Sequence, residues 1–462
     1  MDVAVREKPK FELLSQFPWK WALFWVVVPN LAIMAMWTVG GPSMAGPIFY
    51  CGMLAIVASQ SRHLAVRWAT LVAIYALLLC LYITKSFNLG IGNFIATFEF
   101  AHELDIFASP EYLAAGVVLA ISLGFALRHA RKPMNFNGNF QKLLALVAVA
   151  LVVNADNFAT AGTRGTYKMS APAGTPIDSA VIQAGITPKS VKARNLVVVI
   201  VESWGVPLDP YDKALHAKTW DHARWSGKYR VTEGTSPYYG STTNAELREW
   251  CSEWSDHYSY DFSQAECLPR DFADAGFTTT AMHSFDGDFF ERKEWYPALG
   301  FQQQKFQGRL RREGAEFCNG VFPGACDRDV PRLITRQLAG NPDKRNLVYW
   351  LTVNAHLPVL DDAQLGTKDC ALGDARWNAD FSMLCRNLEV HRQVADALTA
   401  EVMAEDFPQS DILIVGDHMP PFFPRNIRTR FDTANVPWIF LENREAIAAA
   451  VEEPNGTNAT GA

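Results

Sequence analysis

Two apolar runs in the second half of the chain each end in residues that can hold a metal ion. Asp417 and His418 follow the run Ser410–Gly416, and Glu202 follows the run Asn195–Val201. Both runs are rich in β-branched residues, which is typical of buried strands. The carboxyl ends of strands in a parallel α/β sheet meet at one edge, where such sheets carry their chemistry. Carboxylates and an imidazole at this edge predict a site for a divalent metal such as zinc.

The segment Gly240–Leu247 opens a predicted helix and supplies a candidate nucleophile. Hydroxyl side chains and backbone N–H groups come together in its first turn, an arrangement that suits an anion. In one interpretation Ser241 or Thr242 only caps the helix. In the other, Thr242 is a nucleophile whose pKa a metal lowers, as metals do for bound water and thiols.

Five apolar segments fill the first third of the chain: Trp19–Val39, Ala45–Ser59, Leu64–Ile83, Leu113–Leu127 and Leu143–Val153. The first and third are long enough to span a bilayer core, which needs about 20 residues. The other three have lengths that a buried soluble helix could also have.

Basic residues gather in alternate loops around these segments: Arg6, Lys8, Lys10, Lys20, Arg62, Arg67, Arg128, Arg131, Lys132 and Lys142. This alternation follows the positive-inside rule and predicts a five-span anchor with a cytoplasmic N-terminus. Everything after Val153 is then outside the cytoplasm. The first span is long and more spans follow, so we do not interpret it as a cleavable signal peptide.

Six of the cysteines lie in the outer part of the chain and form three close-spaced couples: Cys251 and Cys267, Cys318 and Cys326, Cys370 and Cys385. No couple has the C-x-x-C spacing of a zinc knuckle. We therefore predict three local disulfides in an oxidising compartment. Other pairings among the six stay open on the sequence alone.

We predict four regions: an anchor (1–154), a linker with one short helix (155–194), an outer domain (195–445) and a disordered tail (446–462). Apolar strands alternate with helical patterns in the outer domain, which indicates a mostly parallel α/β sheet covered on both faces. The expected strands are Leu196–Val201, Phe277–Met282, Leu347–Val353, Ile412–Val415 and Trp438–Leu441. The expected helices are Ala245–Ser252, Phe290–Leu299, Asp327–Leu338 and Asn387–Met403. The sequence has no stripe of basic and aromatic residues of the kind that binds nucleic acid, so we expect no nucleic-acid partner.

Several motifs occur in an order that resembles a known family. They are Val-Glu202-Ser-Trp, Gly-Ser-Thr242-Thr-Asn-Ala-Glu, His283, Phe289-Phe-Glu-Arg292 with Tyr296 and Leu299-Gly-Phe301, His356, and Gly-Asp417-His418. The order resembles the membrane-anchored phosphoglycerol and phosphoethanolamine transferases of the alkaline phosphatase and sulfatase superfamily, in particular the lipoteichoic acid synthases. The lipid A phosphoethanolamine transferases share the architecture. The resemblance covers nearly the whole chain and implies a five-span anchor joined to a sulfatase-like α/β domain.

The resemblance implies one set of ligands for a catalytic zinc or manganese ion: Glu202, Thr242, Asp417 and His418. It implies a second set that holds the phosphoryl group and the leaving or entering alcohol: His283, Arg292 and His356. Thr242 would attack the phosphorus, and His356 would carry a proton. The synthases have a Trp where this chain has Phe290, so we expect the pocket for the donor head group to differ. The residues around Thr242 place the chain nearer the phosphoglycerol branch.

These motifs predict a transferase at the outer face of a bacterial inner membrane. It would move a phosphoglycerol or phosphoethanolamine head group from phosphatidylglycerol or phosphatidylethanolamine to an extracytoplasmic glycan, through a phospho-threonine. We expect a monomer. A metal-dependent phosphodiesterase or phosphatase stays open, because the same site hydrolyses if water replaces the acceptor; so does a degenerate, non-catalytic envelope assembly protein. A sulfatase is disfavoured, since the nearest match to its motif, Cys267-Leu-Pro-Arg270, has the Arg one residue early.

Some of these residues also have structural interpretations. His356 follows a predicted buried strand and could be a structural histidine, and Arg292 could be a solvated charge on a helix. Glu246 and Arg248, on the helix after Thr242, are expected to be surface or salt-bridging residues. Glu202 is harder to explain without a ligand, because burying an unpaired carboxylate is costly.

Overall fold

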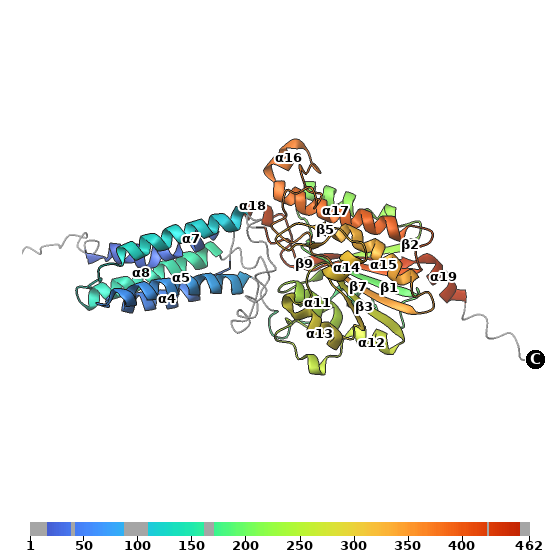
Figure 1. Cartoon of the computed structure of the whole chain (residues 1–462), viewed down its shortest axis with the longest axis horizontal. Helices are drawn as coiled ribbons and strands as arrows, with labels where there is room; N and C mark the ends of the chain where they lie inside the picture. Colours follow the sequence, from blue (N-terminus) through green and yellow to red (C-terminus); the bar gives the residue numbers. More distant parts are fainter. Residues whose placement is uncertain (1–15, 38–41, 87–109, 161–170, 423–424, 453–462) are drawn as a thin grey trace, which may run out of the picture. The chain divides into compact units, whose positions relative to one another are not determined.

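The computed structural model describes residues 16–37, 42–86, 110–160, 171–422 and 425–452, which belong to two compact units (Figure 1). The described part of the first unit lies between residues 16 and 160 and is helical. The described part of the second lies between residues 171 and 452 and contains the large sheet. Residues 161–170 of the predicted linker and 453–462 of the predicted tail lie outside the described residues.

The first unit is built from apolar helices. They are a continuous helical segment made of α2 (Trp19–Trp21), η1 (Ala22–Val27), η2 (Val28–Asn30) and α3 (Leu31–Met36), followed by α4 (Ala45–Ala58), α5 (Leu64–Ser86), α7 (Pro110–His129) and α8 (Asn139–Thr160). Three described segments are long and apolar enough to cross a membrane: Trp19–Met36, Leu64–Lys85 and Asn139–Thr160. The apolar helices Ala45–Ala58 and Leu113–His129 are shorter. The described part of each of the five predicted segments is thus largely helical, and three of them have the length of a span.

Arg67, one of the basic residues counted above, is not solvated but almost completely buried near the start of α5. Its Nε donates to the carbonyl of Ala130 at 2.7 Å. Its two Nη atoms donate to the carbonyls of Ser61 and Arg131, each at 2.6 Å. Arg67 therefore satisfies carbonyl groups at the ends of neighbouring helices, which are left without partners inside a helix.

The second unit is centred on a seven-stranded sheet with the order β2-β9-β8-β1-β7-β3-β4 (Figure 1). Its strands are β1 (Asn195–Val201), β2 (Tyr229–Pro237), β3 (Phe277–His283), β4 (Gln303–Lys305), β7 (Arg345–Leu351), β8 (Ser410–Gly416) and β9 (Asn435–Asn443). Strands β8, β1, β7, β3 and β4 pair in parallel, whereas β9 is antiparallel to both β8 and β2. The predicted mostly parallel α/β sheet is confirmed.

Both faces of the sheet are covered, as the continuous apolar run of β1 predicts for a parallel strand. Alternate residues of β1 enter two different cores: Leu196, Val198 and Ile200 join one, and Val197, Val199 and Val201 join the other. The helices of this unit are α9 (Ala180–Gln183), α10 (Pro210–Thr219), α11 (Thr242–Cys251), α12 (Leu268–Asp274), α13 (Arg292–Leu299), α14 (Gln307–Arg312), α15 (Val330–Ala339), α16 (Ala375–Asp380), α17 (Ser382–Val402), α18 (Arg425–Arg428) and α19 (Arg444–Glu452).

Strands β2 and β4 and helix α19 are among the elements of this unit that the sequence analysis did not predict. The edge strand β2 was not expected, because its sequence Tyr-Arg-Val-Thr-Glu-Gly-Thr-Ser-Pro has few apolar residues. It forms a strand through its backbone pairing with β9, which the sequence of β2 alone does not reveal. The tail predicted from residue 446 begins instead with helix α19. Asn443 accepts a hydrogen bond from the backbone N–H of Ala446 at 3.0 Å, and Ala446 is buried. This cap and this contact hold a helix that composition alone did not reveal.

The three predicted disulfides are present and pair Cys251 with Cys267, Cys318 with Cys326 and Cys370 with Cys385. Cys51 and Cys80 are free and lie in helices of the first unit. The bridge Cys318–Cys326 closes a small hairpin made of β5 (Phe317–Cys318) and β6 (Gly324–Ala325).

Candidate metal and phosphoryl-transfer site

The register of two central strands brings the predicted metal ligands together. Strands β1 and β8 are parallel neighbours in which Val201 is paired with Gly416. Glu202 and Asp417 are the next residues of their strands, so both carboxylates leave the same edge of the sheet. His418 follows directly, and ligand atoms of Glu202, Asp417 and His418 all lie within 4.8 Å of one another.

The hydroxyl of Thr242 lies at the centre of these three side chains. Its Oγ1 is 3.0 Å from Asp417 Oδ2 and 3.2 Å from Glu202 Oε2. It is 3.5 Å from His418 Nε2. Thr242 is the first residue of α11, whereas Ser241 is the N-cap and forms a capping box with Asn244. Ser241, not Thr242, therefore caps the helix, and the Thr242 side chain faces the carboxylates.

The imidazole of His418 is oriented as a metal ligand would be. Its Nδ1 is 3.0 Å from the carbonyl of Met419, so Nδ1 carries the proton. Its Nε2 is then a lone-pair donor, 3.2 Å from Asp417 Oδ2 and 3.6 Å from Glu202 Oε1. A backbone carbonyl that fixes the tautomer in this way is usual behind a metal-bound histidine.

The charges of the cluster also fit a divalent cation. Glu202 and Asp417 are almost completely buried, and among the described residues the neutral His418 imidazole is the only basic side chain within ion-pairing distance of their carboxylates. Burial, and then the charge of Asp417, holds the pKa of Glu202 well above its usual range. Two carboxylates that repel each other in a buried place are stabilised by a cation between them. The hydroxyl, imidazole and carboxylates present fit zinc or manganese.

Ser203 holds the carboxylates of Glu202 and Asp417 in place through two hydrogen bonds. Its backbone is in the left-handed region, with φ 56°, which is uncommon for a residue other than glycine. This turn lets its backbone N–H donate to Asp417 Oδ1 and its hydroxyl donate to Glu202 Oε1, each at 2.8 Å. The two ligands are therefore positioned by hydrogen bonds that exist without a metal.

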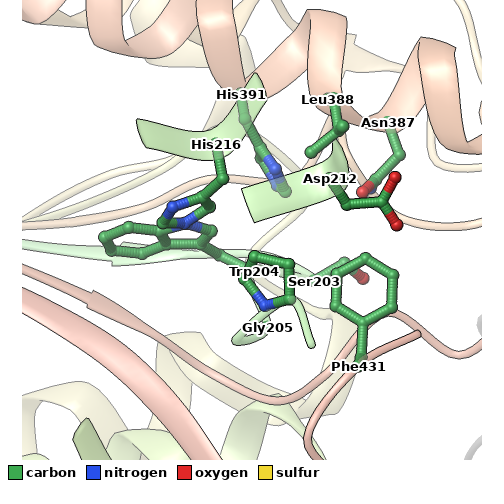
Figure 2. Close-up of a pocket in the computed structure, with 10 residues that line it drawn as sticks. Ser203, Trp204, Gly205, Asp212, His216, Asn387, Leu388, His391 and Phe431 are labelled. Carbon is green, nitrogen blue, oxygen red and sulfur yellow. The ribbon is translucent and has the colours of Figure 1, made fainter. Parts of the chain in front are cut away.

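A layer of buried side chains that includes two histidines lies beside this turn, on the side of α10 and α17 (Figure 2). His391 Nε2 is 3.0 Å from the carbonyl of Glu202. His216 Nε2 accepts a hydrogen bond from Trp204 Nε1 at 2.7 Å. Burial lowers the pKa of His216 to about 3 and that of His391 to about 4, so both rings are neutral near pH 7. The sequence analysis missed both histidines, and no motif marks them.

A second buried cluster lies one helical turn further along α11. Glu246 is completely buried and binds the guanidinium of Arg292, with Nη2 at 2.9 Å and Nε at 3.1 Å from Oε2. The hydroxyls of Tyr296 and Tyr349 donate to its other oxygen. Arg292 is therefore not a solvated charge, and Glu246 is not a surface residue but half of a buried ion pair. Arg248 is likewise buried, paired with Glu249.

The other two predicted site histidines lie outside the Glu202–Asp417–His418 cluster. His283 ends β3, and its Nδ1 is 3.1 Å from the carbonyl of Leu351. Burial and the charge of Arg292 hold its pKa well below the usual range. His356 follows β7, with Nδ1 2.9 Å from the carbonyl of Leu357. Burial, and then the field of His418, lowers its pKa to about 3.

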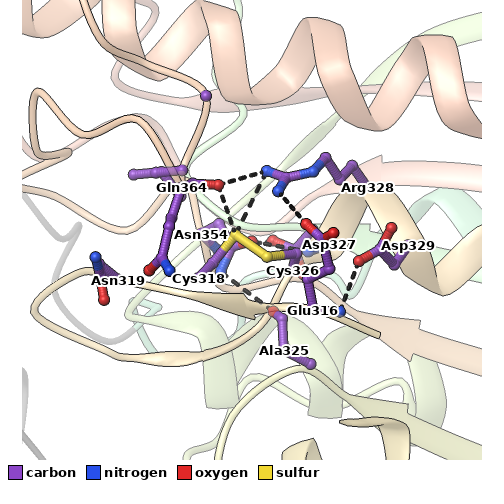
Figure 3. Close-up of a disulfide and its surroundings, with 12 residues drawn as sticks. Glu316, Cys318, Asn319, Ala325, Cys326, Asp327, Arg328, Asp329, Asn354 and Gln364 are labelled. Carbon is purple, nitrogen blue, oxygen red and sulfur yellow. Dashed lines mark hydrogen bonds and ion pairs between the residues drawn. A yellow bond between two sulfur atoms is a disulfide. The ribbon is translucent and has the colours of Figure 1, made fainter. Parts of the chain in front are cut away.

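A buried aspartate holds the segment that carries His356 (Figure 3). Asp327 Oδ2 accepts hydrogen bonds from the backbone N–H groups of Val353 at 2.9 Å and Asn354 at 2.7 Å. The hairpin closed by Cys318–Cys326 ends directly before it, and Phe322 of this hairpin contacts the His356 ring at a centroid distance of 3.9 Å. The sequence analysis missed Asp327, whose position after a bridged cysteine gives no functional signal.

The fold and this cluster define a class: an α/β domain with a candidate metal site and a threonine hydroxyl at its sheet edge. No protein-family model and no curated protein matches the sequence. Solved structures that the chain resembles include phosphoglycerol and phosphoethanolamine transferases.

One is the lipoteichoic acid synthase LtaP from Listeria monocytogenes, with 16% identity and a TM-score of 0.44, covering 55% of this chain and 66% of that chain. Another is the phosphoglycerol transferase GacH from Streptococcus pyogenes, with 16% identity and a TM-score of 0.36, covering 54% and 69%. The lipooligosaccharide phosphoethanolamine transferase EptA from Neisseria meningitidis, an integral membrane protein, has 13% identity and a TM-score of 0.38, covering 95% and 80%. Because no TM-score in this group reaches 0.5, the function proposed below depends on the residues of the site.

Proposed function

We propose that this protein transfers a phosphoglycerol or phosphoethanolamine head group from a membrane phospholipid to an extracytoplasmic glycan. The observation that carries the proposal is the Thr242 hydroxyl, which lies within 3.0–3.5 Å of one carboxylate oxygen each from Asp417 and Glu202 and of His418 Nε2. A threonine with only a structural role does not need two buried carboxylates beside its hydroxyl. A nucleophilic threonine must lose its proton, and it needs groups beside the hydroxyl that assist this loss.

Glu202, Asp417, His418 and the Thr242 oxygen would hold the metal, zinc or manganese. When bound, the metal would lower the pKa of the hydroxyl and polarise a phosphoryl oxygen. These roles use the four groups that the structure brings together.

The reaction would have two displacements at phosphorus. In the first, a bond forms between Thr242 Oγ1 and phosphorus while the bond from phosphorus to the diacylglycerol oxygen breaks, and that oxygen takes up a proton. In the second, a bond forms between a glycan hydroxyl oxygen and phosphorus while the bond from phosphorus to Thr242 Oγ1 breaks; the glycan hydroxyl gives up its proton and the threonine oxygen regains one. His356 would accept the proton of the entering hydroxyl at Nε2, since Nδ1 is bound to the Leu357 carbonyl and the lowered pKa keeps the ring neutral.

His283 and Arg292 would bind the phosphoryl group. The Glu246 carboxylate occupies Nε and Nη2 of Arg292, whereas Nη1 donates to the carbonyl of Phe289 at 3.2 Å. Each Nη of a guanidinium has two N–H groups, so Nη1 retains capacity for a phosphoryl oxygen. Glu246 would then keep the guanidinium in place rather than compete with the substrate.

The apolar helices of the first unit support a membrane location for this reaction, because the donor lipid is itself confined to a membrane. We propose a five-span anchor in residues 1–154, in a bacterial inner membrane. A linker, predicted at 155–194 but beginning after the end of α8 at Thr160, would join it to a catalytic domain (195–445) on the periplasmic face. The donor would be phosphatidylglycerol or phosphatidylethanolamine, and the enzyme would act as a monomer.

Incubation with a phospholipid labelled in its head group tests the proposal. Wild-type protein should release diacylglycerol and gain the mass of glycerophosphate or phosphoethanolamine on the peptide containing Thr242. Thr242→Ala should do neither while its fold is retained. Thr243→Ala is the matched control: Thr243 is the next residue of α11 and is buried, and its hydroxyl is 3.5 Å from that of Ser241.

Full activity of Thr242→Ala would reject the phospho-threonine route. Release of the labelled head group into water, unchanged by added glycan, would instead favour the phosphodiesterase alternative. No release by wild type that carries the metal would favour a non-catalytic assembly protein.

A further inference from the structure

His257 is a buried polar side chain that the proposed mechanism does not use. Its ring is 6% exposed, and among the described residues neither ring nitrogen has a hydrogen-bond partner. A buried polar atom without a partner is unusual in a folded protein, because burying it costs free energy that a hydrogen bond normally offsets. A ligand that reaches both nitrogens would remove this cost.

The chain holds His257 firmly in this place. The bridge Cys251–Cys267 closes the loop that contains it, directly after α11. Asn244, in the first turn of α11, donates its side-chain N–H to the carbonyl of Ser255 at 2.9 Å. The same turn begins with Thr242. The position of His257 is therefore coupled to the helix end that presents the nucleophile.

One neighbour of His257, Phe290, lies two residues before Arg292, which is proposed above to bind the phosphoryl group. The His257 ring lies 3.7 Å from the ring of Tyr258, 5.3 Å from that of Phe290 and 6.2 Å from that of Trp295. Phe290 and the following Glu291 both have left-handed backbones, with φ 57° and 56°. Two successive strained residues are maintained only where the surroundings require them, typically at binding sites. This turn leads into Arg292.

The electrostatics around His257 select against a positively charged ligand. Burial, and then the charge of Arg292, lowers the pKa of His257 to about 3, so the ring is neutral and a positive field acts on it. A neutral imidazole has one N–H donor and one acceptor. Glycerol hydroxyls both donate and accept, and match it. The ammonium of ethanolamine only donates, and its charge would lie in the field of Arg292.

We propose that His257 determines donor specificity by hydrogen-bonding the hydroxyl groups of a phosphoglycerol head group, which makes phosphatidylglycerol the preferred donor. The inference depends on the proposed function and names the substrate class of that site. His257 would contact the part of the head group that does not react, so it would act on binding more than on the chemical step.

The test compares the full-length, metal-loaded protein in detergent micelles containing phosphatidylglycerol or phosphatidylethanolamine, with diacylglycerol release as the readout. Wild type should favour phosphatidylglycerol. His257→Phe, which keeps an aromatic ring in the buried place but removes both nitrogens, should lose about tenfold in kcat/KM for this lipid, mainly through KM. The rate with phosphatidylethanolamine should change less than about twofold. His257→Gln, which keeps one donor and one acceptor, should lie between the two.

Binding gives a second readout that does not depend on turnover. In the Thr242→Ala background, glycerol phosphate should bind more tightly than phosphoethanolamine, and His257→Phe should remove the difference. His222→Ala is the control, since this histidine is partly exposed in an ion pair with Glu233. If His257→Phe failed to fold, His257→Gln would give the same comparison.

Two results would overturn the inference alone: a wild-type preference for phosphatidylethanolamine, or unchanged KM and donor preference in folded His257→Phe or His257→Gln. Wild type that releases diacylglycerol from neither lipid would overturn the proposed function, and the inference with it.

Discussion

Two buried carboxylate clusters lie along helix α11, one turn apart, and they differ in charge balance. Around Thr242, Glu202 and Asp417 have only the His418 imidazole within ion-pairing distance in the described part of the chain. Around Glu246, Arg292 supplies a full positive charge, and two tyrosine hydroxyls complete the hydrogen bonds. The protein itself neutralises the second cluster, whereas no described Lys or Arg side chain pairs with the carboxylates of the first.

This difference distinguishes a carboxylate that the protein itself neutralises from a pair of carboxylates suited to an ion better than burial or residue type does. Both clusters contain buried acidic side chains on central elements of the fold, and a sequence pattern treats them alike. A buried ion pair that is complete holds its members in place. A pair of buried carboxylates without a cation keeps an unfavourable interaction that a bound ion would relieve.

The largest expected effect comes from removing a proposed ligand. His418→Ala should reduce metal from about one ion per chain to a small fraction of that, because affinity should fall by at least about a hundredfold. Elemental analysis of protein dialysed against trace zinc or manganese measures this. His222→Ala should retain the ion, and Arg292→Lys, in the other cluster, should retain it too.

Stoichiometric metal in His418→Ala, or none in active wild type, would remove the distinction between the two clusters. Metal should also stabilise the wild type, by about 4 kcal/mol at a concentration a thousand times Kd. A chelator should therefore lower its Tm but leave that of His418→Ala unchanged.

The balanced cluster should respond in stability. Glu246→Gln leaves the Arg292 guanidinium buried without a counter-charge, which costs about 3–5 kcal/mol in free energy of unfolding. Denaturant unfolding of the full chain in detergent measures it. Glu442→Gln is the control, because its partner Arg230 is more than half exposed and such surface pairs contribute about 1 kcal/mol or less. Equal losses in the two variants would mean that the Glu246 cluster is not a closed ion pair.

Asp327 is a third buried carboxylate, and hydrogen bonds from the backbone stabilise its charge only in part. Asp327 accepts two backbone N–H groups, and burial still raises its pKa to about 6. Since the folded state holds this proton more tightly than the unfolded chain, the free energy of unfolding should fall as pH rises from the usual aspartate range through about 6. The loss should approach about 3 kcal/mol.

Asp327→Asn cannot titrate, so its unfolding free energy should lack this contribution. Unfolding curves of both proteins measured from pH 4 to pH 8 test the sign. A constant difference between wild type and Asp327→Asn over this range would contradict the raised pKa.

The predictable part of the site was the part that depends on a single strand. Glu202 and Asp417-His418 each follow a continuous apolar run, so their places at the sheet edge could be expected from the sequence. Strands β1 and β8 are neighbours in which Val201 pairs with Gly416, and this pairing brings the three side chains together. The parallel sheet and the three disulfides were predicted for the same reason, since runs and short spacings are local features.

What could not be predicted depends on contacts between distant segments. Glu246 and Arg292 are separated by 46 residues, and nothing in either motif indicates that they pair. His257 is a lone histidine in a polar loop, and only its buried ring, without a partner within the described chain, distinguishes it. Strand β2 is polar and is ordered by its partner β9.

The smallest effects should come from the disulfides, and they sharpen the comparison between the two sides of the site. Replacing both cysteines by Ala in Cys251–Cys267 or in Cys318–Cys326 removes a loop closure over 16 or 8 residues. Because the entropy of closure depends only on the logarithm of loop length, both losses should be about 2–3 kcal/mol.

Similar stability losses should nevertheless have different kinetic results. The first loop carries His257, so its opening should raise KM for the donor lipid. The second places Phe322 against His356, so its opening should lower kcat. Chemical denaturation and diacylglycerol release, measured on the same preparations, test both parts. If both variants changed only kcat, or only KM, the division between a donor side and a proton-transfer side would be wrong.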